Sequence, residues 1–372
     1  KTIQAVAFYY DRKEWKILDD SIAADLAFLG TVATGDIEVV SRTLDDQRWI
    51  VAFAQDDNPT HYYLYNRDNR KARFLFTDRK ELEGTPLAEM HPAIIESRDG
   101  LKLMSYCTLP VGSSGNGGFR PEHPLPMVLL VHGGPWERDR WGYNPLHQLF
   151  ANRGYAVLSV NYRGSTGFGK DFINAGNKEW GAKMHTDLID AVQWAIDEGI
   201  AEPERVAIMG GSYGGYATLV GLTFTPETFA CGVDIVGPSN LVTLIDSVPP
   251  YWKPMVELWA TRVGDQRTEE GKAFLMERSP LSYVDRITRP LLIAHGVNDP
   301  RVKQSESDQI VGAMQAKGIP VTYVLYPDEG HGFARPENWL SFVAVAEAFL
   351  ARHLGGRAQE IGDDFKDSSI TV

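Results

Sequence analysis

The sequence Val206-Ala207-Ile208-Met209-Gly210-Gly211-Ser212-Tyr213-Gly214-Gly215-Tyr216 joins an apolar run to a turn in which glycines flank a serine. Residues 217–225 then have the composition of a helix. Glycine at positions 210 and 214 removes Cβ atoms where a strand turns sharply into a helix. The pattern predicts that Ser212 is exposed at a helix N-terminus, which favours developing negative charge. A glycine-rich turn with a structural serine is the alternative interpretation.

Two polar residues downstream of Ser212 follow predicted strands. Asp299 comes after the apolar run 290–295, and His331 lies between two glycines after the run 321–326. A serine becomes a strong nucleophile only when a base takes its proton and a third group orients that base. The order serine, acid, histidine is that of α/β-hydrolases. Because strands of such sheets place functional groups at their carboxyl ends, we expect these three residues to share one edge.

A second glycine motif lies upstream of the serine. The apolar run 127–131 leads into His132-Gly133-Gly134-Pro135. Hydrolases of this type take one oxyanion N–H from this loop and another from the residue after the nucleophile. We therefore predict the backbone N–H groups of Gly134 and Tyr213 as the oxyanion hole. We expect His132 to brace the loop and not to transfer protons.

Taken together, the motifs resemble those of the prolyl oligopeptidase family of serine peptidases, in its acylaminoacyl-peptidase-like branch. The matching stretches extend from about residue 90 to 355, and they are His132–Pro135, Asn161–Gly169, Gly210–Ala217, Asn298–Val302 and Gly330–Phe333. The resemblance implies that Ser212 is the nucleophile, His331 the general base and then acid, and Asp299 its partner. It also implies that Arg301, two places after the aspartate, bonds a substrate carbonyl; a surface ion pair is the alternative.

The implied activity is hydrolysis of peptide or acyl-amino-acid amide bonds in short peptides through an acyl-enzyme. A carboxylesterase with the same three residues is the alternative, and a catalytically inactive binding protein is a remote one. Arg301 favours the peptidase, because a second carbonyl anchor suits a peptide backbone. We expect an apolar substrate pocket formed by Tyr213, Tyr251, Trp252 and Val302, although Tyr251 and Trp252 could equally pack helices together.

Composition restricts the partners. The chain has 372 residues, a net charge of −12 and no basic stripe, so neither nucleic acid nor an anionic membrane surface is an expected partner. No apolar stretch approaches the ~20 residues of a transmembrane helix, and no signal-peptide pattern opens the chain. Cys107 and Cys231 are expected to be buried free thiols. This favours the cytoplasm, with a periplasmic or secreted location left open, and we expect no cofactor or metal.

Residues 1–88 differ in character from the rest of the chain. Short aromatic and β-branched runs at Arg48–Ala54, 60–65 and 72–76 predict antiparallel strands, about one and a half propeller blades. The resemblance implies a β-propeller that covers the active site and filters substrates by size. Because a propeller closes only with at least four blades, we interpret residues 1–88 as a propeller remnant, with a small natural β cap as the alternative. Unpaired edge strands predict a homo-oligomer or disorder near the N-terminus.

Residues 89–356 are predicted to form the catalytic domain. A hairpin around Arg98-Asp99-Gly100 opens it, and apolar strands then alternate with helical segments such as 184–198 and 339–354. This alternation predicts an α/β fold with a doubly wound, mostly parallel sheet. Residues 357–372 are polar and charged, and we expect them to form a frayed C-terminal tail.

Overall fold

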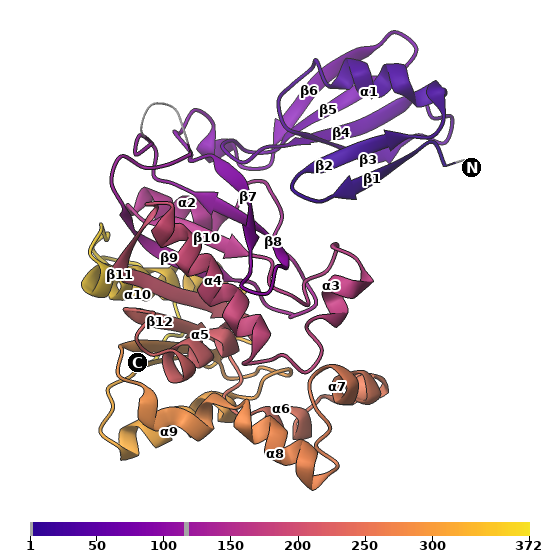
Figure 1. Ribbon diagram of the computed structural model, residues 1–372. Coiled ribbons are helices and arrows are strands. Elements are labelled where there is room, and N and C mark those ends of the chain that lie inside the picture. The colour runs from indigo at the N-terminus through magenta and orange to yellow at the C-terminus, as the bar shows by residue number, and fades with distance from the viewer. Residues whose placement is uncertain (1–2, 115–118) are drawn as a thin grey trace.

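The chain folds into a small β module and a larger α/β part. The computed structural model describes residues 3–114 and 119–372. Two antiparallel sheets, of two and four strands, belong to the N-terminal module (residues 5–77), and an eight-stranded sheet forms the centre of the α/β part. Figure 1 shows the module beside the α/β part, with the N-terminus on the module's outer side.

The N-terminal module contains six strands, a helix and a short 3-10 turn. Their bounds are β1 Ala5–Tyr9, β2 Lys13–Ile17, η1 Asp20–Ile22, α1 Ala23–Leu29, β3 Asp36–Arg42, β4 Arg48–Ala54, β5 His61–Asn66 and β6 Lys71–Thr77. The four-stranded sheet has the order β3-β4-β5-β6. Helix α1 was not predicted from the sequence. It packs Leu26 and Leu29 against Trp49 and Phe53 of β4.

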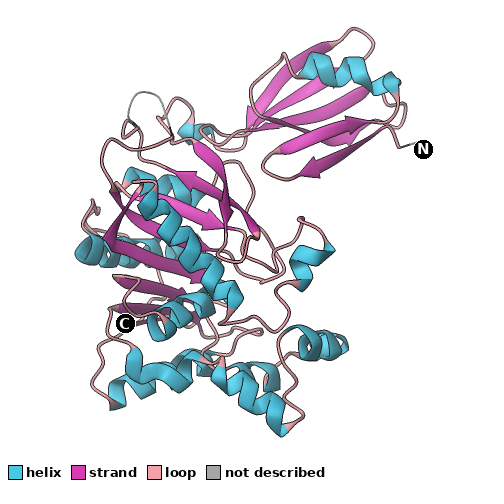
Figure 2. Ribbon diagram, viewed as in Figure 1, coloured by secondary structure: helices cyan, strands magenta, loops and turns pink. Residues whose placement is uncertain are grey.

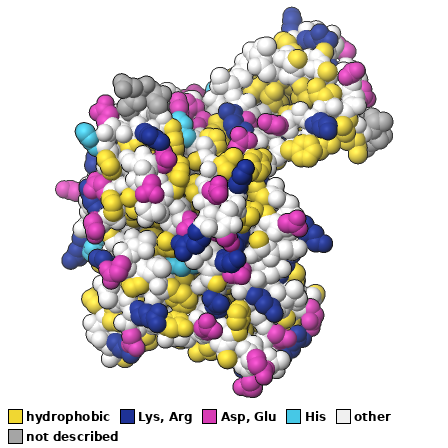
Figure 3. All heavy atoms as spheres, in the orientation of Figure 1, with side chains coloured by type: hydrophobic (Ala, Val, Ile, Leu, Met, Phe, Trp, Pro, Cys, Tyr) yellow, Lys and Arg dark blue, Asp and Glu magenta, His cyan; other side chains and the backbone are white. Residues whose placement is uncertain are grey.

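The module also exposes apolar side chains. Phe8, Val40, Phe74 and Phe76 are each about half exposed or more, and Leu44 is fully exposed. Figure 3 shows apolar side chains gathered on the visible face of this module. Because β3 and β6 are the two edges of its sheet, the module offers both unpaired strand edges and apolar surface to a neighbour.

The eight-stranded sheet has the order β14-β13-β12-β11-β9-β10-β8-β7. Its strands are β7 Met90–Glu96, β8 Lys102–Thr108, β9 Leu125–Val131, β10 Ala156–Val160, β11 Ala201–Gly211, β12 Cys231–Ile235, β13 Leu291–Gly296 and β14 Thr322–Tyr326. From β10 to β14 all neighbours are parallel, whereas β8 pairs antiparallel with both β7 and β10. The sheet confirms the predicted α/β fold with its mostly parallel, doubly wound core.

Helices cover both faces of this sheet (Figure 2). Their bounds are α2 Pro145–Asn152, α3 Lys170–Asn174, α4 Lys183–Asp197, α5 Tyr213–Phe224, α6 Leu241–Asp246, α7 Val256–Arg262, α8 Glu269–Glu277, α9 Gln304–Ala316 and α10 Pro336–Leu354; 3-10 turns are η2 Lys80–Leu82, η4 Pro250–Met255 and η5 Pro280–Arg286. Helices α4, α5 and α9 share one core cluster, and α2 and α10 share another. Within residues 3–114 and 119–372, no helix combines the length and apolarity needed to cross a membrane.

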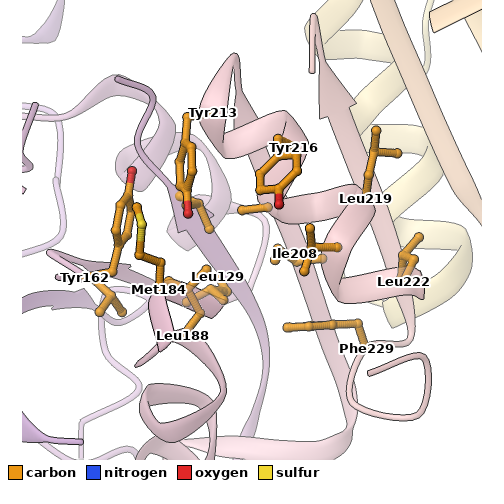
Figure 4. Close-up of a cluster of buried hydrophobic side chains, with 14 of the residues drawn as sticks. Leu129, Tyr162, Met184, Leu188, Ile208, Tyr213, Tyr216, Leu219, Leu222 and Phe229 are labelled. Carbon is orange, nitrogen blue, oxygen red and sulfur yellow. The ribbon is translucent and has the colours of Figure 1, made fainter. Parts of the chain in front are cut away.

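The two core clusters follow the alternation of side chains along each strand. In β9, Met127, Leu129 and Val131 belong to one cluster, and Val128 and Leu130 belong to the other. Figure 4 shows part of the first cluster, where Leu129 lies beside Met184 and Leu188 of α4, with Tyr216, Leu219 and Leu222 of α5 to their right. Since both faces are buried, these strands read as continuous apolar runs in the sequence.

The C-terminal segment differs from the expected frayed tail. Thr371 pairs with Leu325 of edge strand β14, and the side chain of Ile370 packs on the core cluster of α2 and α10. Asn338 accepts hydrogen bonds at Oδ1 from the backbone N–H of Ser369 and the hydroxyl of Ser368, at 2.9 and 3.0 Å. The expectation of fraying is wrong for residues 368–371, because tertiary contacts hold a segment whose composition alone suggests disorder.

Candidate active site

Ser212 lies on a strained turn between β11 and α5. Its φ is 58° and its ψ is −117°, a conformation that non-glycine residues rarely adopt. Glycines on both sides make the turn possible. A Cβ on Gly210 would lie 2.5 Å from the carbonyl oxygen of Val131, and one on Gly214 would overlap the same oxygen. The Ser212 N–H donates to the carbonyl of Ile235 at 2.8 Å, which fixes the turn to β12.

The predicted acid and base lie together at the same sheet edge. Asp299 follows β13 and His331 follows β14, while Ser212 follows β11, so all three leave the carboxyl ends of parallel strands. Oδ2 of Asp299 is 2.6 Å from Nδ1 of His331. The ionised carboxylate can only accept, so Nδ1 carries the proton and Nε2 is left free to accept one. Among the residues that the structure describes, the Ser212 hydroxyl makes no hydrogen bond.

Backbone donors hold the carboxylate of Asp299 in place. Its Oδ1 accepts the N–H groups of Arg301 at 2.7 Å and Val302 at 3.0 Å. Burial raises the pKa of Asp299, but the hydrogen bond and charge of His331 and these two backbone N–H groups outweigh it, so the net pKa is below the usual value. These interactions therefore favour the ionised form of Asp299, which accepts the Nδ1 proton of His331.

Sequence reasoning missed two residues that support this pair. His295 is buried within β13; its Nε2 lies 3.0 Å from the carbonyl of Val302 and its Nδ1 2.7 Å from Oγ of Ser307. Glu329, two residues before His331, is buried, and its carboxylate accepts hydrogen bonds from the N–H groups of Ala334 and Arg335, each at 2.9 Å. His295 could have been noticed as a polar residue inside an apolar strand, because a buried polar group needs hydrogen-bond partners.

The two predicted oxyanion donors occupy suitable backbone positions. Tyr213 is the first residue of α5, where the N–H groups have no partner within the helix. Gly134 has a φ of +117° and is exposed in the loop after β9. A Cβ there would lie 2.6 Å from the backbone nitrogen of Trp136. Both the conformation and the close approach therefore require glycine at position 134.

His132 supports this loop as expected. Its ring stacks on Tyr162 with centroids 4.4 Å apart, Nε2 lies 3.0 Å from Oγ of Ser165, and Nδ1 lies 2.8 Å from the carbonyl of Gly133. Burial lowers the pKa of His132 to about 4. The imidazole is consequently neutral at neutral pH, and both ring nitrogens are already engaged.

The candidate substrate-binding residues lie in different environments. Arg301 is exposed, and its guanidinium forms no ion pair within the described part of the chain, which argues against the surface ion-pair interpretation. Val302 is only 4% exposed: its N–H donates to Asp299, its carbonyl contacts His295, and its side chain belongs to the core cluster of α4, α5 and α9. Tyr251 is 60% exposed, whereas Trp252 packs its ring 5.8 Å from that of Trp259.

A chain of aromatic rings connects Trp252 to the turn that carries Ser212. The ring centroids of Trp259 and Trp180 are 6.2 Å apart, and those of Trp180 and Tyr213 are 4.6 Å apart. Trp136, from the loop after β9, packs edge-on to Trp259 at 6.0 Å. Sequence reasoning did not single out Trp136, Trp180 or Trp259, since their separation along the chain hides the cluster.

Known proteins match the chain over most or all of its length. A sequence model of the prolyl oligopeptidase family matches residues 141–357. Dipeptidyl aminopeptidase BIII of Pseudoxanthomonas mexicana is 61% identical over 370 residues, which is 100% of this chain and 54% of that protein. The acylamino-acid-releasing enzyme of Arabidopsis thaliana is 30% identical over 232 residues, covering 60% of this chain and 30% of that enzyme.

Solved structures give the same result for the fold. Pyrococcus horikoshii acylaminoacyl peptidase superimposes with a TM-score of 0.76 at 21% identity, over 97% of this chain and 56% of that one. The chain thus spans about half the length of the proteins it matches. The strand order and the glycine-flanked turn at Ser212 are consistent with the family match over residues 141–357. The chain therefore belongs to the prolyl oligopeptidase family.

Proposed function

We propose that this chain carries the catalytic machinery of a serine peptidase that acts through an acyl-enzyme. The observation that carries the proposal is the 2.6 Å contact between His331 Nδ1 and Asp299 Oδ2, at the sheet edge where Ser212 follows β11. In the proposed reaction, Ser212 Oγ attacks the substrate carbonyl while Nε2 of His331 takes its proton. His331 then protonates the leaving amine, and a water molecule releases the acyl group by the same route.

The oxyanion of each tetrahedral intermediate would bind the N–H groups of Tyr213 and Gly134. The Tyr213 N–H points from the first turn of α5, where the helix dipole adds favourable potential. Asp299 does not gain the proton; it keeps His331 in the correct tautomer and stabilises the imidazolium. Its lowered pKa supports this role.

The proposed substrate is a short peptide. Arg301 is exposed two residues beyond Asp299 and has guanidinium donors for a substrate carbonyl. The exposed ring of Tyr251 and the half-buried ring of Trp252 would provide the apolar wall of a side-chain pocket, whereas Tyr213 and Val302 are only 2% and 4% exposed and belong to the core. The 61% identity to a protein named as a dipeptidyl aminopeptidase favours release of dipeptides over release of acylated amino acids.

The remaining proposals concern organisation and location. We interpret residues 1–88 as part of a β-propeller, supported by the four-stranded antiparallel sheet β3-β4-β5-β6. The exposed apolar side chains of this region support self-association of the chain. We interpret residues 89–356 as the catalytic domain and residues 357–372 as a polar C-terminal segment, of which Thr371 pairs with β14. Cys107 and Cys231 are both buried and unpaired, which supports a reducing compartment such as the cytoplasm.

Steady-state kinetics on three matched substrates would test the proposed activity. The substrates are a dipeptidyl p-nitroanilide with a free N-terminus, an N-acetyl-aminoacyl p-nitroanilide and a p-nitrophenyl ester. We expect turnover of at least one anilide, and Ser212→Ala should lower kcat by about a thousandfold or more. Ser282→Ala, an exposed serine outside the site, is the matched control and should behave as wild type.

The pattern across substrates separates the alternatives. Preference for the dipeptidyl anilide supports dipeptide release, and preference for the acetylated anilide supports acylamino-acid release. Ester turnover alone would favour the carboxylesterase. Anilide turnover that survives Ser212→Ala would contradict the proposal, and so would the absence of labelling by a fluorophosphonate probe.

A further inference from the structure

A single buried arginine connects the loop after β9 to the N-terminal module. Arg138 is only 8% exposed. Its Nη1 donates to the carbonyl oxygen of Tyr9 and its Nη2 to that of Tyr10, each at 2.8 Å. Its Nε donates to the carbonyl of Asp139 in its own loop at 3.0 Å. The guanidinium therefore joins its own loop to Tyr9 and Tyr10, which precede Arg138 by 129 and 128 residues in the sequence.

The carbonyls that accept these bonds belong to Tyr9, the last residue of β1, and Tyr10, the first residue of the turn that leads to β2. The next carbonyl in that turn, of Asp11, accepts the hydroxyl of Tyr106 from β8 at 2.7 Å. Three consecutive backbone oxygens of the module thus take donors from the α/β part. Because the acceptors are backbone atoms, replacing the side chains of the turn would leave them in place.

The surroundings of Arg138 leave it little freedom. Its guanidinium lies 4.3 Å from the centroid of the Phe168 ring. A Cβ on Gly167 would lie 2.7 Å from Nη1. Its Nη2 also lies 3.4 Å from the Tyr106 hydroxyl, and within residues 3–114 and 119–372 no carboxylate pairs with the guanidinium. Its buried charge therefore depends on carbonyl acceptors, two of which are present only when the module is docked.

The same loop carries Gly134. The segment 161–166 also holds the backbone of this loop. The Thr166 N–H donates to the backbone carbonyl of Glu137 at 3.0 Å, and the Asp139 N–H donates to Oδ1 of Asn161 at 2.8 Å. We propose that Arg138 is a positioning residue through which the N-terminal module sets the place of the Gly134 N–H. This inference rests on the proposed function, in which that N–H binds the oxyanion.

Substitutions at position 138 test the inference in the complete chain. Arg138→Met keeps an apolar stem and removes every donor, and Arg138→Lys keeps the charge with fewer, differently placed donors. Arg140→Met is the matched control, because Arg140 lies in the same loop, is exposed and has its guanidinium 5.6 Å from the Tyr9 ring centroid. For each variant we would measure Tm, kcat and KM on the best anilide, and Ki for a peptide boronic acid.

We expect Arg138→Met to lower kcat by about tenfold to a hundredfold, because small displacements of catalytic groups have effects of this size. KM should change by less than about threefold, and the boronic acid, which forms a tetrahedral adduct, should lose affinity in proportion to kcat/KM. Arg138→Lys should recover part of kcat, and Arg140→Met should match wild type. A folded Arg138→Met with unchanged kcat would overturn the inference, as would a loss confined to KM.

Two further outcomes are also decisive. If Arg138→Met does not fold, the comparison of Arg138→Lys with Arg140→Met carries the test, and equal kcat values would overturn the inference. If wild type shows no turnover that depends on Ser212, the proposed function fails instead. Amide hydrogen exchange then tests the mechanical part alone: Arg138→Met must speed exchange in residues 134–139 relative to Arg140→Met, and equal rates would overturn it.

Discussion

The carboxylate of Asp299 lies 2.6 Å from the imidazole of His331, although the two residues lie in loops that follow different strands. Strands β13 and β14 are parallel neighbours with Gly296 opposite Tyr326, so the loops that follow them begin at the same height. Close contact between Gly296 and the backbone of Gly330 brings the loops together, because a Cβ on Gly296 would overlap Gly330. The acid–base pair therefore depends on strand register and on one glycine as much as on its own side chains.

Replacing Asp299 should test its orienting role. We expect Asp299→Asn to lower kcat by about a thousandfold or more with little change in KM, since an amide can stabilise the wrong histidine tautomer. Asp308→Asn, the same change at an exposed site on α9, should leave kcat near wild type. Steady-state kinetics on the best anilide would check both, and equal kcat values in the two variants would remove Asp299 from the mechanism.

Two glycine-to-alanine changes should have opposite effects on stability. A Cβ at Gly214 would overlap the Val131 carbonyl, so Gly214→Ala should destabilise the chain by about 3 kcal/mol or more. In the described structure nothing lies within 4 Å of a Cβ at Gly312 on α9, so Gly312→Ala should stabilise by about 0.5–1 kcal/mol. Urea unfolding would measure both. A harmless Gly214→Ala would show that the turn can relax.

Buried Asp234 on β12 predicts a pH dependence of stability. Burial raises its pKa to about 7 despite the hydrogen bond from the Gly237 N–H, whereas the unfolded-state value is near 3.8. Between these values the unfolded chain loses its proton and the folded chain keeps it, so the Asp234 contribution to stability falls as pH rises from about 4 to about 7.

Asp234→Asn removes this titration. We expect its free energy of unfolding, relative to wild type, to increase by at least about 1 kcal/mol between pH 4 and pH 7 and then to stay level. Denaturant unfolding at four pH values would measure the difference. A difference that is constant with pH would mean that Asp234 titrates alike in the folded and unfolded chain.

Arg301 should affect substrate binding more than chemistry. We expect Arg301→Met to raise KM for peptide anilides by about fivefold to thirtyfold, the loss of one charge-assisted hydrogen bond, with a smaller effect on a simple ester. Lys303→Met, another exposed cation of the same segment, is the control and should behave as wild type. If both variants raise KM equally, a general charge effect explains the result and the specific carbonyl contact is absent.

The sequence by itself determined which three residues are the candidates for the catalytic chemistry. Ser212, Asp299 and His331 could be found because each follows an apolar run long enough to be a buried strand, and because glycines mark the turns around Ser212 and His331. These are local sequence patterns, and local patterns can be recognised without knowledge of the fold. The parallel, doubly wound sheet followed from the alternation of such runs with helical segments.

Tertiary structure alone decided which distant groups meet. The strand order placed β12 between Ser212 and the acid–base pair, and it buried His295 and Glu329 where they hold the Asp299 and His331 loops. It also set Arg138 on the carbonyls of Tyr9 and Tyr10 and packed Trp180 edge-on against Tyr213. These contacts join residues far apart in the chain through backbone oxygens and ring faces. Such groups occur in every sequence, so only their arrangement in space gives them a role.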